Sequence, residues 1–175
     1  MYMNIGIFPG TFDPIHEGHI SFSLLAARQH SLDKVMFLPE PSPREKTKVS
    51  HIDQREQWAR DVTDSYPSID VVRLRSKQFS VAETLPFLEQ KFPDATLHLL
   101  LGSDVVKTFS YRWPGVEVLL ARMPLIVGLR AGDSRESIEA ALLDCQTAFG
   151  VTITYHILDS PHPHIASSYL PKNRT

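Results

Sequence analysis

The sequence is poor in cysteine, in net charge and in long apolar runs, and each shortage excludes a class of protein. Its 175 residues include one cysteine, Cys145, which excludes an intramolecular disulfide and a cysteine-pair metal site. Lysine and arginine number 18 against 20 aspartates and glutamates, giving a formal net charge of −2. That balance argues against binding to a long nucleic acid, which usually needs a basic surface. We expect Cys145 to be a small buried residue on a helix.

The apolar segments are too short for targeting or for crossing a membrane. The first eight residues, MYMNIGIF, lack the basic region and long apolar stretch of a signal peptide. The later run VEVLLARMPLIVGL is interrupted by Arg122 and Pro124 and is too short to span a bilayer. Hydrophobic residues make up 42% of the chain, enough for one domain with a full core. We therefore expect residues 1–175 to form a single cytoplasmic domain.

Short apolar runs alternate with segments of helical periodicity, which is the pattern of an α/β protein. The predicted strands are residues 4–8, 35–38, 69–74, 96–101, 125–129 and 151–156. The predicted helices are residues 19–29, 51–65, 81–92 and 134–149, with short helices at 104–109 and after Trp113. This alternation predicts a Rossmann-like parallel sheet with helices on both faces. Its ligand crevice should lie at the carboxyl ends of the strands.

Three of the predicted helices carry more detailed expectations. The residues expected to face the core are Ile20, Leu24 and Ala27 in the first helix and Ile52, Trp58 and Val62 in the second. Ser80, followed three residues later by Glu83, has the spacing of a capping box at the start of the third helix.

The segment FPGTFDPIHEGHI, from Phe8 to Ile20, joins the first predicted strand to the first helix. Its glycines allow a ligand to approach the backbone closely. The helix that follows directs its free N–H groups and the positive end of its dipole toward the same place. The segment matches neither G-x-G-x-x-G nor G-x-x-x-x-G-K-[ST]. We nevertheless expect it to bind phosphate.

Two histidines stand at the start of that helix. His16 and His19 are three residues apart, so both rings can face one side, and Gly18 between them leaves room for a ligand. Imidazoles can donate to phosphate oxygens and stabilise the negative charge of a transition state at phosphorus. No protein nucleophile is needed if a substrate phosphate attacks directly. A zinc site is disfavoured, because no third ligand is evident nearby.

The run GIFPGTFDPIHEGHI closely resembles the signature of nucleotidyltransferases with an H-x-G-H motif. Those proteins have a Rossmann-like fold and join a nucleoside triphosphate to a substrate phosphate, releasing pyrophosphate. Nearly the whole chain resembles one group of them, the bacterial nicotinate mononucleotide adenylyltransferases. The segments carrying this likeness are, in order, FLPEPSP, SHIDQREQWARDV with the family arginine at Arg55, FSVAETLPFLEQKFPDATLHLLLGSD, WPGVEVLLARMPLIVGLR and IASSYL.

This resemblance implies roles for residues along the whole chain. His16 and His19 would bind the triphosphate of ATP and stabilise the reaction at its α-phosphorus. The other residues implied on the ATP side are Phe8, Gly10, Thr11, Phe12, Gly18, Gly102, Asp104, Ser167 and Ser168. Those implied on the side of the mononucleotide substrate are Thr84 and Trp113, with Trp113 stacking on the pyridine ring, together with the basic Arg44 and Lys46. Mg²⁺ would accompany ATP and offset its charge, with no metal ligand assigned to the protein.

Two phosphate-binding positions depart from the family pattern. The family's proline loop usually continues Pro-Pro-His-Lys, whereas Ser42–Glu45 here reads Ser-Pro-Arg-Glu. The family's C-terminal motif ends in an arginine where this chain has Pro171, so Lys172 and Arg174 are the candidates to replace that charge. Three readings follow: adenylyl transfer to nicotinate mononucleotide, transfer to another phosphate such as pantetheine phosphate, or a nucleotide-binding paralogue with little or no activity. The sequence leaves the choice between the acid and the amide of the pyridine open.

Overall fold

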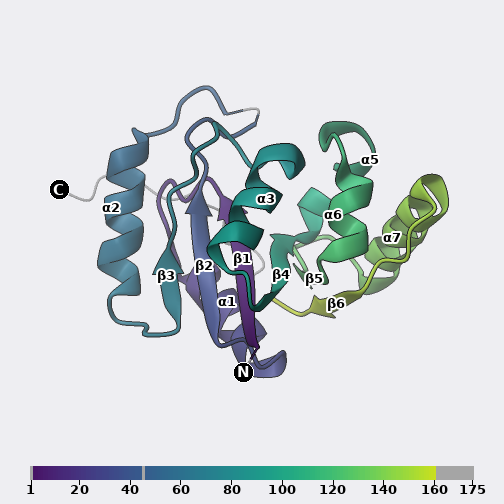
Figure 1. Ribbon diagram of the computed structural model, residues 1–175, viewed down its shortest axis with the longest axis horizontal. Coiled ribbons are helices and arrows are strands. Elements are labelled where there is room, and N and C mark those ends of the chain that lie inside the picture. Colours follow the sequence, from purple (N-terminus) through teal and green to yellow (C-terminus); the bar gives the residue numbers. More distant parts are fainter. Residues whose placement is uncertain (1, 45, 161–175) are drawn as a thin grey trace.

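The sheet confirms the predicted α/β architecture. We describe the protein from a computed structural model, which describes residues 2–44 and 46–160. Six parallel strands form one sheet in the order β3-β2-β1-β4-β5-β6 (Figure 1). The strands are β1 (Met3–Gly10), β2 (Lys34–Pro39), β3 (Ile69–Val71), β4 (Ala95–Gly102), β5 (Leu125–Gly128) and β6 (Tyr155–Leu158). This order is the classic doubly wound one, in which the chain crosses back at the boundary between β1 and β4.

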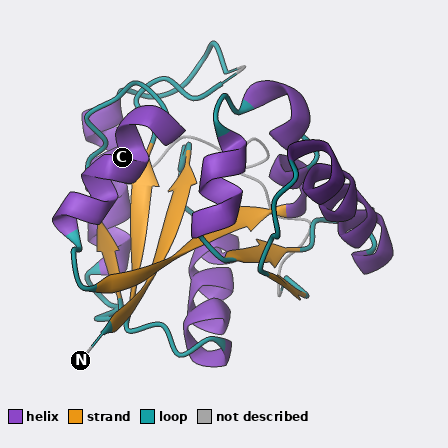
Figure 2. Ribbon diagram, turned by 45° about the vertical axis from the view of Figure 1, so that its right-hand side comes forward, coloured by secondary structure: helices purple, strands orange, loops and turns teal. Residues whose placement is uncertain are grey.

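Helices cover both faces of the sheet (Figure 2). They are α1 (Glu17–Gln29), α2 (Ile52–Thr63), α3 (Val81–Lys91), α4 (Ser103–Val106), α5 (Phe109–Arg112), α6 (Val116–Arg122) and α7 (Arg135–Phe149). One core cluster packs α1 and α2 on the sheet, and a larger one packs α3, α6 and α7 on the other face. Cys145 is buried in the larger cluster, as expected. Within the described residues, no helix is both long enough and apolar enough to cross a membrane.

Helix α1 buries a partly different set of residues from the one its periodicity predicts. Ile20 is buried as expected, but Leu24 is exposed and Ala27 is only partly buried. Phe22, Ser23 and Ala26 are buried instead. The Ser23 hydroxyl donates to the carbonyl of His19, so its polar group is satisfied inside the interface.

Helix α2 presents a different face from the predicted one. Its buried residues are Arg55, Ala59 and Thr63. The predicted set, Ile52, Trp58 and Val62, is only half-buried. The expectation was wrong because it counted apolar residues only, whereas the side chain that fixes this helix is a charged one.

Two local predictions are also corrected by the hydrogen bonding. Ser80 is the N-cap of α3, but its hydroxyl makes no capping bond, and its backbone N–H donates to Thr84 Oγ1 at 2.9 Å. The last strand begins at Tyr155 rather than at residue 151. The reason is that the N–H of Ile153 bonds the side chain of Gln146 on α7, at 2.8 Å, and so is not available to a strand ladder.

The carboxyl ends of the central strands meet at one edge of the sheet. Gly10 at the end of β1 is level with Pro39 of β2, and Gly102 at the end of β4 is level with Gly128 of β5. The segments that leave these ends therefore start side by side at the switch point, where open α/β sheets bind their ligands.

Candidate active site

The two histidines predicted from the first loop lie against one another. The rings of His16 and His19 stack with centroids 3.6 Å apart and planes 25° from parallel. His16 is buried and precedes α1, and His19 is partly buried in its first turn. The backbone N–H of His16 donates to Nδ1 of His19 at 3.2 Å. Because Nδ1 accepts, the neutral ring of His19 carries its proton on Nε2.

The environment of His19 keeps that ring neutral. Its pKa lies well below the ordinary value, first because the ring is buried and then because of the charges of His16, Arg130 and Lys46. A neutral imidazole can still donate through Nε2, and the nearby cations and the N-terminus of α1 favour an anion at the same place. The pair is therefore suited to hydrogen bonding with phosphate oxygens.

Aromatic packing fixes the loop on which the histidines stand. The Phe12 ring stacks on Phe37 at 4.9 Å and meets His19 edge-on at 4.9 Å. Phe12 has a φ of 46°, in the left-handed region that non-glycine residues seldom adopt and that costs about 1–3 kcal/mol. A Cβ on Gly10 would lie 3.0–3.3 Å from the Phe12 ring. The predicted ATP-side residues Gly10, Thr11 and Phe12 thus form a fixed turn, and the Phe8 ring is buried behind it.

A buried arginine holds this turn to two other segments. The Arg55 side chain is fully buried and donates to four carbonyls: Thr11 at 2.6 Å, Ser50 at 2.8 Å, Glu40 at 2.9 Å and Pro41 at 3.1 Å. Burial lowers the pKa of Arg55, whereas the charges of Asp13 and Glu40 raise it. Sequence reasoning gave Arg55 no role. The structure shows it joining the loops that follow β1 and β2.

The second side of the cleft is formed after β4 and β5. Arg130 pairs with Asp104 at 3.4 Å, and its backbone N–H donates to the buried Ser103 hydroxyl at 2.9 Å. A Cβ on Gly102 would contact the Asp104 carboxylate and lie 2.8 Å from Arg130 Nε, so a side chain there would displace this ion pair. Sequence reasoning noted the segment after β5 but missed Arg130 itself, whose signal was a lone arginine following a predicted strand.

One hollow brings residues from both sides together. It is lined by Phe8, Gly18, His19, Phe22, Gly102, Gly128, Arg130 and Ser160. Four of these were predicted on the ATP side or as catalytic, and they come from β1, α1 and β4. The structure thus joins the first loop to the end of β4, as the predicted crevice requires.

Trp113 packs with other aromatic side chains against the larger core cluster, on the face of the sheet opposite α1. Its ring contacts Phe79 at 5.5 Å and Phe109 edge-on at 5.6 Å, and its indole N–H donates to Thr108 Oγ1 at 3.0 Å. The Arg44 guanidinium stands over the ring, 4.9 Å from its centroid. The predicted substrate residues Arg44 and Trp113 are therefore in direct contact, while Lys46 is exposed and its charge acts on His19.

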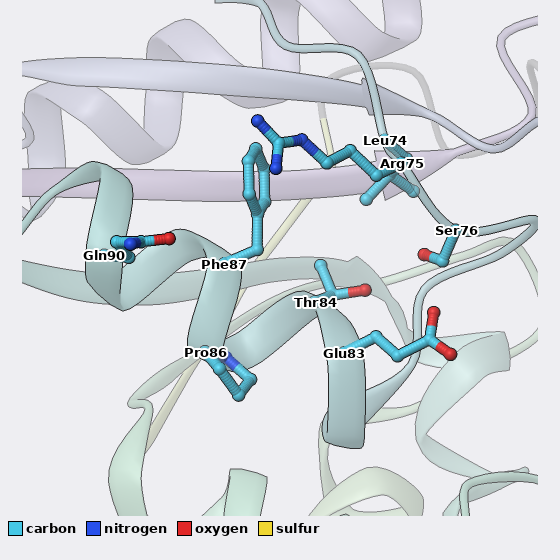
Figure 3. A pocket seen from close by; sticks show the side chains of 8 residues that line it. All are labelled: Leu74, Arg75, Ser76, Glu83, Thr84, Pro86, Phe87 and Gln90. Atoms are coloured by element: carbon cyan, nitrogen blue, oxygen red, sulfur yellow. The ribbon is translucent and has the colours of Figure 1, made fainter.

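Thr84 has a different setting from Trp113. It lines a pocket whose side chains come from α3 and from the segment after β3 (Figure 3). Arg75 there stands over the Phe87 ring at 5.2 Å. Trp113 is not one of the residues lining this pocket. The Thr84 side chain is buried and accepts a hydrogen bond from the backbone N–H of Ser80, a contact that holds the start of α3.

Several predictions fall outside the described residues. They are Ser167 and Ser168 on the ATP side, together with Glu45, Pro171, Lys172 and Arg174. Among residues 2–44 and 46–160, no group of three or more histidine, cysteine, aspartate or glutamate side chains could hold a metal ion. These residues do not form a protein cage for Mg²⁺, which commonly binds through substrate phosphates and water.

Comparison with known proteins gives a consistent family. A family model described as cytidylyltransferase-like matches residues 7–172. A probable nicotinate-nucleotide adenylyltransferase of Dictyoglomus turgidum is 35% identical over 73% of this chain, and the match spans 64% of that relative's length, less than two thirds. A Flavobacterium johnsoniae protein of the same description is 29% identical over 96% of this chain and 84% of its own.

Solved structures share the fold. Plasmodium falciparum nicotinic acid mononucleotide adenylyltransferase complexed with NaAD superposes with a TM-score of 0.76 at 19% identity, covering 95% of this chain and 82% of its own. The same enzyme complexed with APC gives a TM-score of 0.73 at 19% identity, over 95% and 81% of the two chains. At that identity the likeness establishes the arrangement of strands and helices.

Proposed function

The chain belongs to the cytidylyltransferase-like family, and we propose that it transfers the adenylyl group of ATP to nicotinate mononucleotide in NAD biosynthesis. The observation that carries this proposal is the stacked His16–His19 pair beside the N-terminus of α1. Relatives described as probable nicotinate-nucleotide adenylyltransferases support the choice of acceptor. We also propose that residues 1–175 act as one nucleotidyltransferase domain and that the protein works in the cytoplasm.

In this reaction a phosphate oxygen of the mononucleotide attacks the α-phosphorus of ATP. A new P–O bond forms, the bond from the α-phosphorus to the bridging oxygen breaks, and pyrophosphate leaves with that electron pair. His19 donates to the phosphate oxygens through Nε2, with His16 stacked against it. Their hydrogen bonds stabilise charge that grows in the transition state, and no covalent intermediate with the protein forms.

The remaining parts of the cleft bind and orient the two substrates. The fixed turn of Gly10, Thr11 and Phe12 lies along them through its backbone. Gly102, with the Arg130–Asp104 pair beside it, faces the adenosine of ATP, and Ser167 and Ser168 meet its phosphates. Trp113 stacks on the pyridine ring, while Thr84 lines a separate pocket and holds the start of α3. Mg²⁺, bound to the phosphates of ATP, offsets their charge when ATP is bound.

A pyrophosphate-release assay with ATP and Mg²⁺ tests the proposal. We expect release with nicotinate mononucleotide to exceed that with pantetheine phosphate and to disappear in the double variant His16→Ala, His19→Ala. Greater release with pantetheine phosphate would show that pantetheine phosphate, and not nicotinate mononucleotide, is the acceptor. Nucleotide binding by calorimetry without release on any acceptor would favour the alternative of an inactive nucleotide-binding paralogue.

A further inference from the structure

Glu40 is bonded through its backbone to the turn that we assign to the ATP side of the cleft. It directly follows β2, and its N–H donates to the carbonyl of Gly10 at 2.9 Å. Its carbonyl accepts from Nη2 of Arg55 at 2.9 Å, and the same guanidinium bonds the carbonyl of Thr11 through Nη1 at 2.6 Å. The backbone of Glu40 is therefore fixed relative to the turn at Gly10 and Thr11.

The side chain of Glu40 is bonded to the segment that precedes α3. Its Oε1 accepts the backbone N–H of Phe79 at 2.8 Å. The carbonyl of Phe79 accepts from Nη2 of Arg44 at 3.0 Å, and its buried ring packs on Trp113 with centroids 5.5 Å apart. The next residue, Ser80, is the N-cap of α3. One carboxylate thus connects the ATP-side turn to the peptide that supports Trp113 and the start of α3.

The charge of this carboxylate strengthens the connection. The Glu40 side chain is half-buried, and an ionised oxygen accepts an N–H more strongly than a neutral one does. Burial raises the pKa of Glu40, and the bond from Phe79 and three nearby cations offset only part of that rise. The cations are Arg44 and Lys46 on the loop after β2 and Arg55 on α2. The bond to Phe79 therefore weakens when the carboxyl group takes up a proton.

We propose that Glu40 is a positioning residue, which holds the acceptor side of the cleft in register with the ATP side; the inference rests on the proposed function. The two substrates are bound by different segments, and the acceptor phosphate must meet the α-phosphorus in line. The rate of such a transfer depends steeply on the distance and angle between the reacting atoms. Glu40 acts through Phe79 and Trp113 and moves no proton to or from a substrate.

Initial-rate kinetics with nicotinate mononucleotide at pH 7.5 test this role. Glu40→Ala removes the acceptor of the Phe79 N–H, so kcat/KM for the mononucleotide should fall about 10- to 100-fold, the range for losing one charged hydrogen bond. The KM for ATP should change less than about threefold, because Arg55 still holds the ATP-side turn.

Asp33→Ala is the matched control for Glu40→Ala. The Asp33 carboxylate also accepts a backbone N–H from a distant segment, that of Asn4 at 2.7 Å, but it lies at the amino end of β1. Its removal should leave the kinetic parameters of both substrates unchanged. Equal losses in the two variants, or a loss confined to ATP, would overturn the inference.

A pH profile separates positioning from a general loss of folding. Glu40→Gln keeps an oxygen for the Phe79 N–H but carries no charge. Above the pKa of Glu40, the wild-type protein should therefore have the higher kcat/KM for the mononucleotide. As the pH is lowered through that pKa, the wild-type carboxyl group becomes neutral like the amide, so the ratio of wild type to variant should fall toward one. A ratio that stays constant with pH would overturn the inference.

A binding measurement separates this inference from the proposed activity. The chain has two tryptophans, Trp58 and Trp113, so a Trp58→Phe background leaves Trp113 as the only indole fluorophore. Without ATP, half-quenching of Trp113 by nicotinate mononucleotide should need about tenfold more ligand in Glu40→Ala and no more in Asp33→Ala. If the wild-type protein releases no pyrophosphate, the proposed activity fails, yet this titration still decides the inference. Equal affinity with and without Glu40, or no quenching in either protein, would overturn it.

Discussion

Helix α1 carries a histidine group at each end, and the two groups are alike in local geometry. At its N-terminus, His16 and His19 stack at 3.6 Å. At its C-terminus, His30 meets His156 at 4.3 Å, and His98 of β4 is coupled to both. The pKa values of His19, His30 and His98 are all lowered, with burial as the largest cause. Close imidazoles with lowered pKa values therefore occur twice in this molecule.

The two groups differ in what surrounds them. The N-terminal group faces the positive end of the helix and the charges of Arg130 and Lys46, and it stands on a turn held by Arg55. For the C-terminal group, the charges that lower the pKa of His98 are those of its own histidine neighbours. The C-terminal end of a helix is also negative, which does not favour an anion. The comparison teaches that the surrounding charges, and not the clustering of histidines, distinguish the group that is suited to binding an anion.

The largest expected effect comes from removing the arginine that holds the N-terminal group. Arg55→Ala should lower the free energy of unfolding by about 3–5 kcal/mol, the range for breaking a buried charged network, because four carbonyls lose their donor. Chemical denaturation measures this loss. The matched control is Arg60→Ala on the same helix, which removes an exposed i,i+4 pair with Glu56 and should cost about 0.3–0.5 kcal/mol. Similar losses in the two variants would contradict the conclusion that Arg55 holds these segments together.

The next largest effect is expected on the reaction rate, and it compares variants of the two histidine groups directly. His19→Ala should reduce kcat for pyrophosphate release about 10²- to 10³-fold, the range for losing one preorganised donor to a transition state. His30→Ala, at the other end of the same helix, should change kcat by less than about threefold. Circular dichroism should confirm that both variants keep their helices. If the two substitutions reduced the rate equally, the distinction between the groups would fail.

A smaller effect should follow from the cation that only the N-terminal group possesses. Arg130→Met removes a positive charge that lowers the pKa of His19, so that pKa should rise toward its ordinary value while the pKa of His30 stays constant. Histidine-selective NMR titration measures both. The rate should fall about 10- to 100-fold through loss of one charged donor near the phosphates. An unmoved His19 titration would show that Arg130 does not act on that ring.

The smallest effect concerns the C-terminal group and the pH dependence of stability. The folded pKa values of His30 and His98 lie below 6.5, so below about pH 6.5 the unfolded chain binds more protons than the folded one. The free energy of unfolding should therefore be steady above about pH 6.5 and fall as the pH drops below it. His98→Gln should lessen that fall, as measured by denaturation at pH 7.5 and pH 5.5. The same pH slope in the variant and the wild type would contradict a contribution from this group.

Local patterns were enough to predict most of the fold and the closeness of the two histidines. Apolar runs and their spacing predicted six strands in a parallel sheet, and the three-residue spacing predicted that the rings of His16 and His19 can face one side. These features depend on residues close together in the chain. The periodicity of helices and strands and the partial charge at a helix terminus depend on residues within one or two turns, so they can be predicted from the sequence alone.

Features that join distant segments were not predictable in the same way. The burial of Arg55 depends on carbonyls of Thr11, Glu40 and Pro41 that only the folded loops bring to it. The wrong face assigned to α2 has the same origin, because the buried charge of Arg55 outweighed apolar periodicity.

The sequence by itself determined the alternation of strands and helices and the placing of two imidazoles where the first helix begins. Only the tertiary structure decided which charges face them and that Arg44 rests on Trp113. The physical reason is the distance along the chain over which each effect acts. The periodicity of helices and strands depends on neighbouring residues, whereas the electrostatic field at a buried ring is the sum of the fields of charged groups that come together when the sheet has formed.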